Sequence, residues 1–262
     1  MLTPIKQTLQ PIHKAVMEPL NNIHDLVYLQ WYFRDSKRLR KFKNIHKGES
    51  CFIIGNGPSL NKMDLSLLAS LNTFGLNKIY LMFDEVDIHL TYHVAVNPIV
   101  IEQSKRHFEA LNCSSFLSMR PAYRSVKRMN HIYRICTGGP FPFQTDASRI
   151  LYEGYTVTYV AMQLAFYMGF SKVFLIGVDH NFIAFGKPNE EQNLVGHDPN
   201  HFAGSYFGDQ KWNLPDLDGS EVAYHLAKFY FERDNRCIYD ATVDGKLEIF
   251  PKLSYEEAIA LY

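Results

Sequence analysis

Residues 51–60, CFIIGNGPSL, decide the fold. The apolar run 51–54 is rich in β-forming residues and ends at a glycine, which predicts a buried strand. Gly55, Asn56 and Gly57 allow a sharp turn that approaches a ligand closely, and Pro58 and Ser59 suit the first turn of a helix. The amide groups and dipole of a helix N-terminus favour an anion. The stretch therefore predicts a phosphate-binding turn, with a plain strand–helix turn as the alternative, because it lacks both the six-residue dinucleotide fingerprint and a P-loop lysine.

The remainder of the chain alternates between strand and helix patterns. Such alternation predicts an α/β fold with a Rossmann-like, doubly wound and mostly parallel sheet. Two turn-rich stretches interrupt this pattern: 120–148 is expected to be a surface loop or lid, and 183–219 a second long loop. The expected strands are 51–54, 74–77, 87–96, 114–119, 172–177 and 237–239, with an edge segment at 247–251, and the expected helices are 62–71, 99–111, 158–168, 220–232 and 255–261.

Composition excludes several classes of protein. The 262 residues carry 27 basic and 27 acidic side chains, so nothing global favours nucleic acid as a partner. The four cysteines are scattered without a CxxC pair, which favours a reduced, cytoplasmic protein without disulfides or zinc. No apolar run reaches the ~18 residues of a membrane span. We expect one main domain, residues 48–262, after an N-terminal helical extension, residues 1–47.

A helix is expected over residues 23–43, apolar and aromatic in its first half and basic in its second. Two interpretations stay open. The helix lies peripherally on the inner face of an anionic membrane, or it packs on the main domain with a solvated basic face.

Polar residues follow several of the predicted strands. Asn56, Asn77, Asn97 and Asp179 each stand where a strand ends. Ligands of doubly wound sheets bind at the carboxyl ends of the strands. These four side chains therefore predict a binding site at the carboxyl ends of the strands.

The chain also resembles a known superfamily. The motifs are IIGNGPSL at 53–60, FGLNKIY at 74–80, VNP at 96–98, TVTYVAMQLAFYMGFSKVFLIGVDHNF at 156–182 and HFAG at 201–204. Together they resemble the bacterial sialyltransferases of glycosyltransferase family 42 and the MptE-like 6-hydroxymethylpterin diphosphokinases. The resemblance spans roughly residues 51–239.

The sialyltransferase resemblance implies roles for particular residues. His201, followed by the aromatic Phe202, matches the family's general base. Asn181 falls where that family has a tyrosine facing the donor phosphate, and His180, which has no family counterpart, either joins the acid–base chemistry or packs. The implied contacts of the nucleotide are Gly55, Asn56, Gly57, Pro58, Ser59, Asn77, Asn97 and Thr156, with Asp179 beside them.

The chain departs from the sialyltransferase pattern at several positions. Asn181 and Lys187 replace tyrosines, and Gly154 stands where the family has an arginine. These changes leave a nucleotide-activated sugar other than CMP-sialic acid open as donor.

Three functions are consistent with the sequence. The first is a glycosyltransferase that moves a sugar from a nucleotide sugar, most simply a CMP-sugar, to a glycan or lipid-linked acceptor in surface polysaccharide synthesis. The second is an ATP-dependent diphosphokinase, which requires Mg²⁺ held by Asp179 and one of Asp84, Glu85 or Asp87. The third is a non-catalytic nucleotide-sugar binder. No permanently bound cofactor is expected, and Mg²⁺ is expected only for the diphosphokinase. The lone DxD at 216–218 is interpreted as a solvated acidic turn, and a homo-oligomer stays open.

Overall fold

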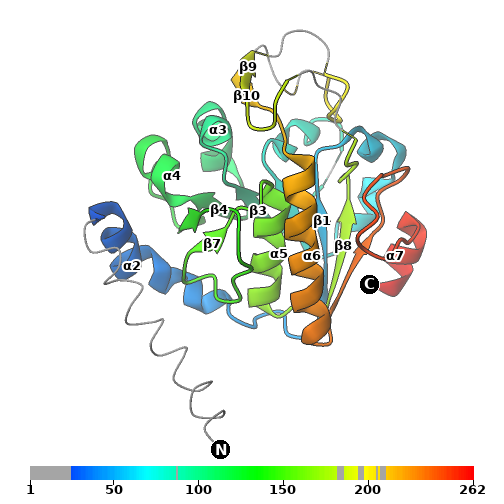
Figure 1. The fold of residues 1–262 in the computed structure, drawn as a ribbon, viewed down its shortest axis with the longest axis horizontal. Helices are drawn as coiled ribbons and strands as arrows, with labels where there is room; N and C mark the ends of the chain where they lie inside the picture. Colours follow the sequence, from blue (N-terminus) through cyan, green and yellow to red (C-terminus); the bar gives the residue numbers. More distant parts are fainter. Residues whose placement is uncertain (1–24, 87, 182–185, 194–197, 205, 207–210) are drawn as a thin grey trace, which may run out of the picture.

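A seven-stranded parallel sheet forms the centre of the molecule (Figure 1). The computed structural model describes residues 25–86, 88–181, 186–193, 198–204, 206 and 211–262. The strand order is β11-β8-β1-β2-β3-β4-β5, and each neighbouring pair is parallel. The strands are β1 (Ser50–Ile54), β2 (Thr73–Leu76), β3 (Tyr92–Ala95), β4 (Ser114–Ser118), β5 (Ile132–Ile135), β8 (Lys172–Ile176) and β11 (Cys237–Asp240).

The chain changes direction across the sheet at β1. From β1 it steps outward through β2, β3, β4 and β5, then returns to place β8 on the other side of β1, with β11 beyond it. The predicted Rossmann-like, doubly wound fold is confirmed. The topological switch lies between β1 and β8, which is where such sheets bind ligands.

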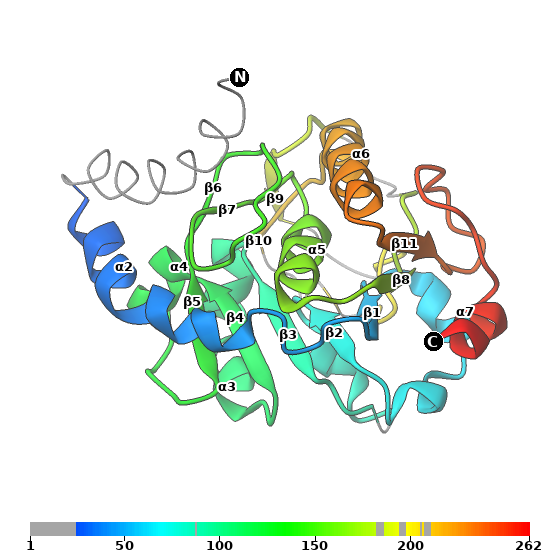
Figure 2. The same ribbon diagram turned by 90° about the horizontal axis from the view of Figure 1, so that it is seen from below.

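Helices cover both faces of the sheet (Figure 2). One face carries α5 (Val157–Met168) and α6 (Leu217–Arg233), with α2 (Leu26–Leu39) further along it. The other carries α3 (Pro98–Ala110), α7 (Tyr255–Leu261) and three 3-10 turns (Pro58–Lys62, Leu65–Leu68 and Ile79–Met82). The short α4 (Met119–Ser125) lies against α3, and a further 3-10 turn, Arg40–Phe42, continues α2.

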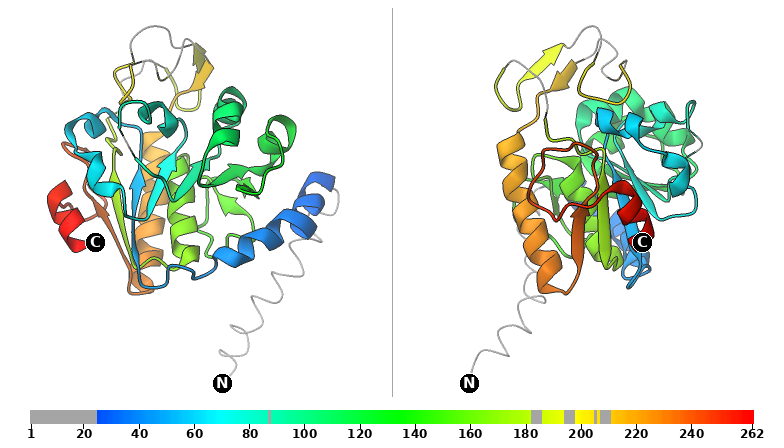
Figure 3. Two further views of the ribbon diagram at one scale, coloured as in Figure 1. Left: turned by 180° about the vertical axis from the view of Figure 1, so that it is seen from behind. Right: turned by 90° about the vertical axis from the view of Figure 1, so that its right-hand side faces the viewer.

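Two small two-stranded sheets lie outside the main one. A hairpin of β9 (Glu191–Asn193) and β10 (Lys211–Asn213) projects beyond the edge of the main sheet at the top of Figures 1 and 3. This hairpin belongs to the stretch 183–219 that was expected to be a second long loop. A second pair, β6 (Thr137–Gly138) and β7 (Leu151–Tyr152), is parallel and precedes α5.

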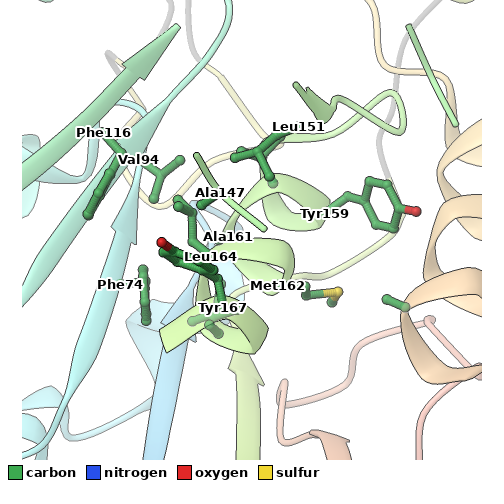
Figure 4. Packing of buried hydrophobic residues seen from close by; sticks show 14 of the residues in the cluster. Phe74, Val94, Phe116, Ala147, Leu151, Tyr159, Ala161, Met162, Leu164 and Tyr167 are labelled. Carbon is green, nitrogen blue, oxygen red and sulfur yellow. The ribbon is translucent and has the colours of Figure 1, made fainter. Parts of the chain in front are cut away.

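The central strands and α5 form the core because the strands carry apolar side chains on both faces and α5 carries them around most of its circumference. In β1, Cys51 and Ile53 face α5, whereas Phe52 and Ile54 face the 3-10 turns and α7. Helix α5 is buried on nearly all sides, as its sequence predicts, and Figure 4 shows its side chains packed between Phe74 and Phe116 of the sheet and the neighbouring helix. Gly169 ends α5 in the left-handed conformation, with φ of +94°.

Helix α2 packs on the main domain. Asp25 caps it by accepting a hydrogen bond from the amide of Tyr28, and Tyr28 and Trp31 are buried. The indole of Trp31 donates to the carbonyl of Arg134 in β5 at 2.7 Å. The packed interpretation is therefore confirmed for one side of the helix, while its basic side stays exposed. Residues 23 and 24 of the expected helix lie outside the described part, and no helix of the described part is long and apolar enough to cross a membrane.

Three predicted elements are wrong. The helix expected over 62–71 is two 3-10 turns, because Met63 is extended and Asp64 caps a new turn on the amide of Ser66. The stretch 120–148 contains α4 and β5 rather than only loop. The segment 247–251 forms no strand; a single bridge between Asp240 and Lys252 takes its place. The strand expected over 87–96 is confirmed only as β3, and Asp87 lies outside the described residues.

Candidate functional site

Two adjoining cavities lie at the carboxyl ends of β1, β2, β3 and β8. The smaller, of about 180 Å³, sits at the topological switch between β1 and β8. The larger, of about 550 Å³, extends over the ends of β2 and β3 towards β10. Asn77, Tyr155, Thr156 and His201 line both cavities, so the two form one continuous site. Most of the predicted site residues line it: Gly55, Asn56, Gly57, Asn77, Asn97, Thr156, Asp179, His180, Asn181 and His201.

The glycine turn after β1 presses against β8. The amide of Gly57 donates to the carbonyl of Gly177 at 2.9 Å. A Cβ at Gly55 would lie 2.1 Å from that same carbonyl oxygen, and a Cβ at Gly57 would lie 1.8 Å from Oδ2 of Asp179. Both glycines are thus required by the protein's own close approach, which is a different reason from the ligand contact that the sequence suggested.

A carboxylate occupies the turn where the sequence suggested a phosphate. Oδ1 of Asp179 accepts from the amide of Ser59 at 3.1 Å, and Oδ2 accepts from the Ser59 hydroxyl at 2.7 Å. Pro58 and Ser59 line neither cavity, and the turn they begin is a five-residue 3-10 helix. Burial raises the pKa of Asp179, while the Ser59 hydrogen bonds oppose this. Ser59 therefore holds Asp179 in place and is not exposed to a ligand.

Two asparagines present amide groups to the smaller cavity. Nδ2 of Asn56 donates to the carbonyl of Leu76 at 3.0 Å, and Oδ1 of Asn56 is buried without a hydrogen-bond partner among the described residues. Asn77 has a positive φ of +49°, and its carbonyl lies 2.8 Å from Nε2 of the buried His93. Burial lowers the pKa of His93 to about 4, so a neutral ring fixes Asn77 from behind.

Strained backbone gathers at the smaller cavity. Asn77, Tyr155 and His180 are non-glycine residues with φ of +49°, +60° and +55°, and all three line it. Such conformations cost roughly 1–3 kcal/mol each and concentrate at ligand sites. The strained backbone therefore supports a binding or catalytic function for the cavity at the carboxyl ends of the strands.

Three helix N-termini point at the cavities. Thr156 caps α5 by accepting from the amide of Thr158 at 3.3 Å, and Asn97 caps α3 by accepting from the amide of Ile99 at 2.8 Å. Asp216 caps α6 through the amide of Gly219 at 2.8 Å. The side-chain oxygens of Thr156 and Asn97 are thus engaged in capping. The positive ends of α5 and α6 meet the smaller cavity, those of α3 and α5 the larger one.

His201 forms an ion-pair geometry with Asp198. Nδ1 of His201 lies 2.6 Å from Oδ2 of Asp198, and the Asp198 side chain is fully buried. The imidazole stacks on Tyr206, with ring centroids 3.8 Å apart and planes at 4°, and meets Trp212 edge-on at 5.8 Å. Since a carboxylate only accepts hydrogen bonds, Nδ1 carries a proton, and in the neutral form of the ring the lone pair therefore lies on Nε2. Asp198 was not predicted; the only signal was an acidic residue three positions before the histidine.

His180 and Asn181 follow β8 at the far side of the smaller cavity. Nε2 of His180 lies 2.9 Å from Oε1 of Glu221 on α6, so this ring also has a carboxylate partner. Asn181 is exposed and lines the smaller cavity. Lys187 lines neither cavity among the residues described for them.

The larger cavity contains an acidic group that sequence reasoning missed. Oε1 of Glu153 accepts from the hydroxyl of Thr137 at 2.7 Å, and that hydroxyl lies 2.9 Å from the Ser118 hydroxyl. Burial raises the pKa of Glu153, and the Thr137 hydrogen bond opposes this. Trp212 lines the same cavity. An aromatic ring beside a carboxyl and amides suits a hydroxyl-rich group.

A magnesium site is poorly supported by these residues. Asp179 and Asp216 line one cavity, but Asp179 is committed to Ser59 and Asp216 to its cap. The described residues contain no cluster of three metal-ligating side chains. The cavity linings of the described part also contain no lysine or arginine, so the helix N-termini are the positive groups that face a ligand.

Comparison with known proteins agrees with the resemblance noted in the sequence. No curated protein matches the chain. A solved structure, the MAf glycosyltransferase from Magnetospirillum magneticum AMB-1, matches its fold with a TM-score of 0.50 and 13% identity, over 86% of this chain and 38% of that one. The family model described as "6-hydroxymethylpterin diphosphokinase MptE-like" matches residues 21–184, which is more than half of the chain. The chain therefore belongs to the MptE-like family.

Proposed function

We propose that this protein is a glycosyltransferase that moves a sugar from a nucleotide sugar to a hydroxyl of a glycan or lipid-linked acceptor. The observation that carries the proposal is the position of the Asp198–His201 pair, whose imidazole lines both cavities. A base where two subsites meet can take the proton of the acceptor hydroxyl as its bond to the sugar forms. The MptE-like family and the fold of the MAf glycosyltransferase support a transferase.

The proposed reaction is a direct displacement. The acceptor oxygen forms a bond to the anomeric carbon while the bond from that carbon to the phosphate oxygen breaks. The nucleotide leaves with the electron pair, and the acceptor proton passes to Nε2 of His201. Asp198 holds the ring by Nδ1 and its charge stabilises the imidazolium that forms.

The donor is assigned to the smaller cavity, with a CMP-sugar as the first candidate from the sialyltransferase resemblance. Asn56 and Asn77 offer amide groups to the nucleotide. The phosphate is assigned to the N-terminus of α5 at Thr156 rather than to the glycine turn, because the Ser59 amide is already bonded to Asp179. The sugar and its acceptor meet in the larger cavity, beside Glu153 and Trp212.

The proposal is tested by product formation from a panel of nucleotide sugars, with release of free nucleotide as the readout. We expect one cytidine-linked donor to be consumed, and consumption to continue in EDTA because the residues for a metal are poorly placed. A diphosphokinase, which the family name favours, would instead consume ATP with a hydroxymethylpterin and stop in EDTA. Binding of a nucleotide sugar without turnover would leave the non-catalytic binder.

The proposed acceptor also suggests where the protein acts in the cell. A glycan or lipid-linked acceptor of a surface polysaccharide is consistent with a protein at the cytoplasmic side of a membrane, and we carry that location as part of the proposal.

A further inference from the structure

The outer side of α2 exposes apolar side chains in unusual number. Leu26 is 78% exposed and Phe33 59% exposed, and Val27 is exposed as well; Ile45, which follows the 3-10 turn after the helix, is also exposed. Four of the eleven large exposed apolar residues in the described part of the chain fall within residues 26–45. Core packing accounts for the opposite side of the helix, at Tyr28 and Trp31, but not for these four.

The same segment is strongly basic. Residues 25–47 contain seven lysines and arginines against two aspartates, in a chain whose formal charge is zero. Asp25 pairs with Arg120. Asp35 is buried, accepts from the Tyr123 hydroxyl at 2.6 Å and lies 3.8 Å from Arg38, so it offsets part of the charge of that one cation. The cations are Arg34, Lys37, Arg38, Arg40, Lys41, Lys43 and Lys47.

A cavity of about 320 Å³ opens beside this helix, and its lining is mostly cationic and polar. Arg40, Lys43 and Arg149 line it with Tyr32 and Tyr167, and Asp146 is its one carboxylate. Nε of Arg149 lies 3.8 Å from Oδ2 of Asp146, which leaves an excess of positive charge. Guanidinium and ammonium groups with a tyrosine hydroxyl are the donors that bind a phosphate.

The apolar side and the cationic cavity are continuous. Leu26, Phe33 and Arg40 are spaced by seven residues, which places them along one line of the helix. That line ends in the cavity, since Arg40 lines it. The cavity is separate from the candidate active site, because Tyr167 and Thr156 stand at opposite ends of α5, roughly 17 Å apart at 1.5 Å per residue.

We propose that the outer side of α2 rests on an anionic phospholipid surface, with a lipid headgroup phosphate in the cavity of Arg40, Lys43 and Arg149. Phe33 and Leu26 insert at the boundary between headgroups and acyl chains, and the surrounding cations meet the negative surface potential. An apolar line flanked by cations is complementary to such a surface. The inference does not depend on the reaction assigned above.

Sedimentation of the full chain with vesicles tests this proposal. We expect binding to phosphatidylcholine vesicles that contain phosphatidylglycerol, little binding to phosphatidylcholine alone, and weaker binding as salt is raised. Phe33→Ser should lower the partition coefficient about tenfold, and Arg40→Ser and Lys43→Ser about fivefold each. The matched controls are Phe229→Ser on α6, where the ring is 56% exposed, and Lys246→Ser, an exposed lysine after β11, which is the edge strand opposite to β5 and α2.

The three variants in and just after α2 (Phe33→Ser, Arg40→Ser and Lys43→Ser, here called the α2 variants) change exposed side chains, so their thermal unfolding midpoints should stay at the wild-type value. The proposal is overturned by equal binding to neutral vesicles, by no binding to either vesicle, or by control variants that reduce binding as much as the α2 variants do. A change from dimer to monomer on Phe33→Ser, without any effect on vesicles, would show that a second copy of the chain covers this side instead.

Discussion

Nδ1 of His201 lies 2.6 Å from Oδ2 of the fully buried Asp198, at the boundary between two cavities. This contact fixes which ring nitrogen carries the proton. The stacked Tyr206 fixes the ring plane. An imidazole held in this way is prepared to accept a proton at Nε2.

Asp198→Asn should lower turnover by about 10²-fold or more, because an amide can hold the ring in the wrong tautomer and no longer stabilises the imidazolium. Donor affinity should stay unchanged, since the assigned nucleotide contacts lie at Asn56 and Asn77. Turnover and calorimetric donor affinity are measured on the same preparation. A variant with wild-type turnover would show that Asp198 is only a structural partner.

The contact between Gly57 and Asp179 predicts an energetic coupling. Gly57→Ala places a Cβ against Oδ2 of Asp179 and should destabilise the fold. In an Asp179→Ala background the same change should cost at least about 1 kcal/mol less, because the nearest obstacle is gone. Urea unfolding of the four proteins gives this coupling. Strict additivity would mean that the Gly177 carbonyl, and not Asp179, accounts for the glycine.

The buried His93 predicts an acid-labile fold. Its pKa falls from about 6.5 in the unfolded chain to about 4 in the native protein because the ring is fully buried. The unfolded state therefore binds more protons between these values. His93 contributes stability that is complete above about pH 6.5 and is lost as pH falls through about 4, by roughly 3 kcal/mol. In His93→Gln the loss between pH 7 and pH 4.5 should be smaller. An unchanged pH dependence would assign it to other groups.

Replacing Glu153 should weaken binding of the acceptor in the larger cavity without changing binding of the donor. Glu153→Gln keeps a group that accepts from Thr137 and removes a carboxyl whose pKa is raised by burial, so the fold should be no less stable at neutral pH. The acceptor KM should rise about tenfold, since hydrogen bonds to charged groups contribute about 1.5–3 kcal/mol. Thr137→Val is the companion variant. A lower donor affinity with an unchanged acceptor KM would reverse the assignment of the two cavities.

The sequence predicted the fold because local patterns and topology agreed. The apolar run before Gly55 and the buried helix that ends at Gly169 are local features, and alternating strands and helices leave few arrangements. The positions of Asn56, Asn77 and Asp179 at strand ends also predicted, from the sequence alone, that they share one site. The strand Ile132–Ile135 was missed because its four residues include an arginine and follow a basic stretch.

The contacts between residues within the site could not be predicted from the sequence. Ser59 was expected to meet a phosphate, but its partner Asp179 stands 120 residues away in the chain. Glu153 and Trp212 come together only because β7 and β10 end at the same cavity. Such pairings depend on how loops close over the sheet, and no periodicity encodes that closure.

The central claim is that His201 is the base at the junction of donor and acceptor. His201→Ala and His180→Ala are compared in one experiment, since each ring lines the smaller cavity and each has a carboxylate partner. We predict that His201→Ala lowers turnover at least about 10²-fold with donor affinity nearly unchanged, and that His180→Ala keeps most of its turnover. Loss of turnover in His180→Ala with retention in His201→Ala would contradict the account and move the base to the end of β8.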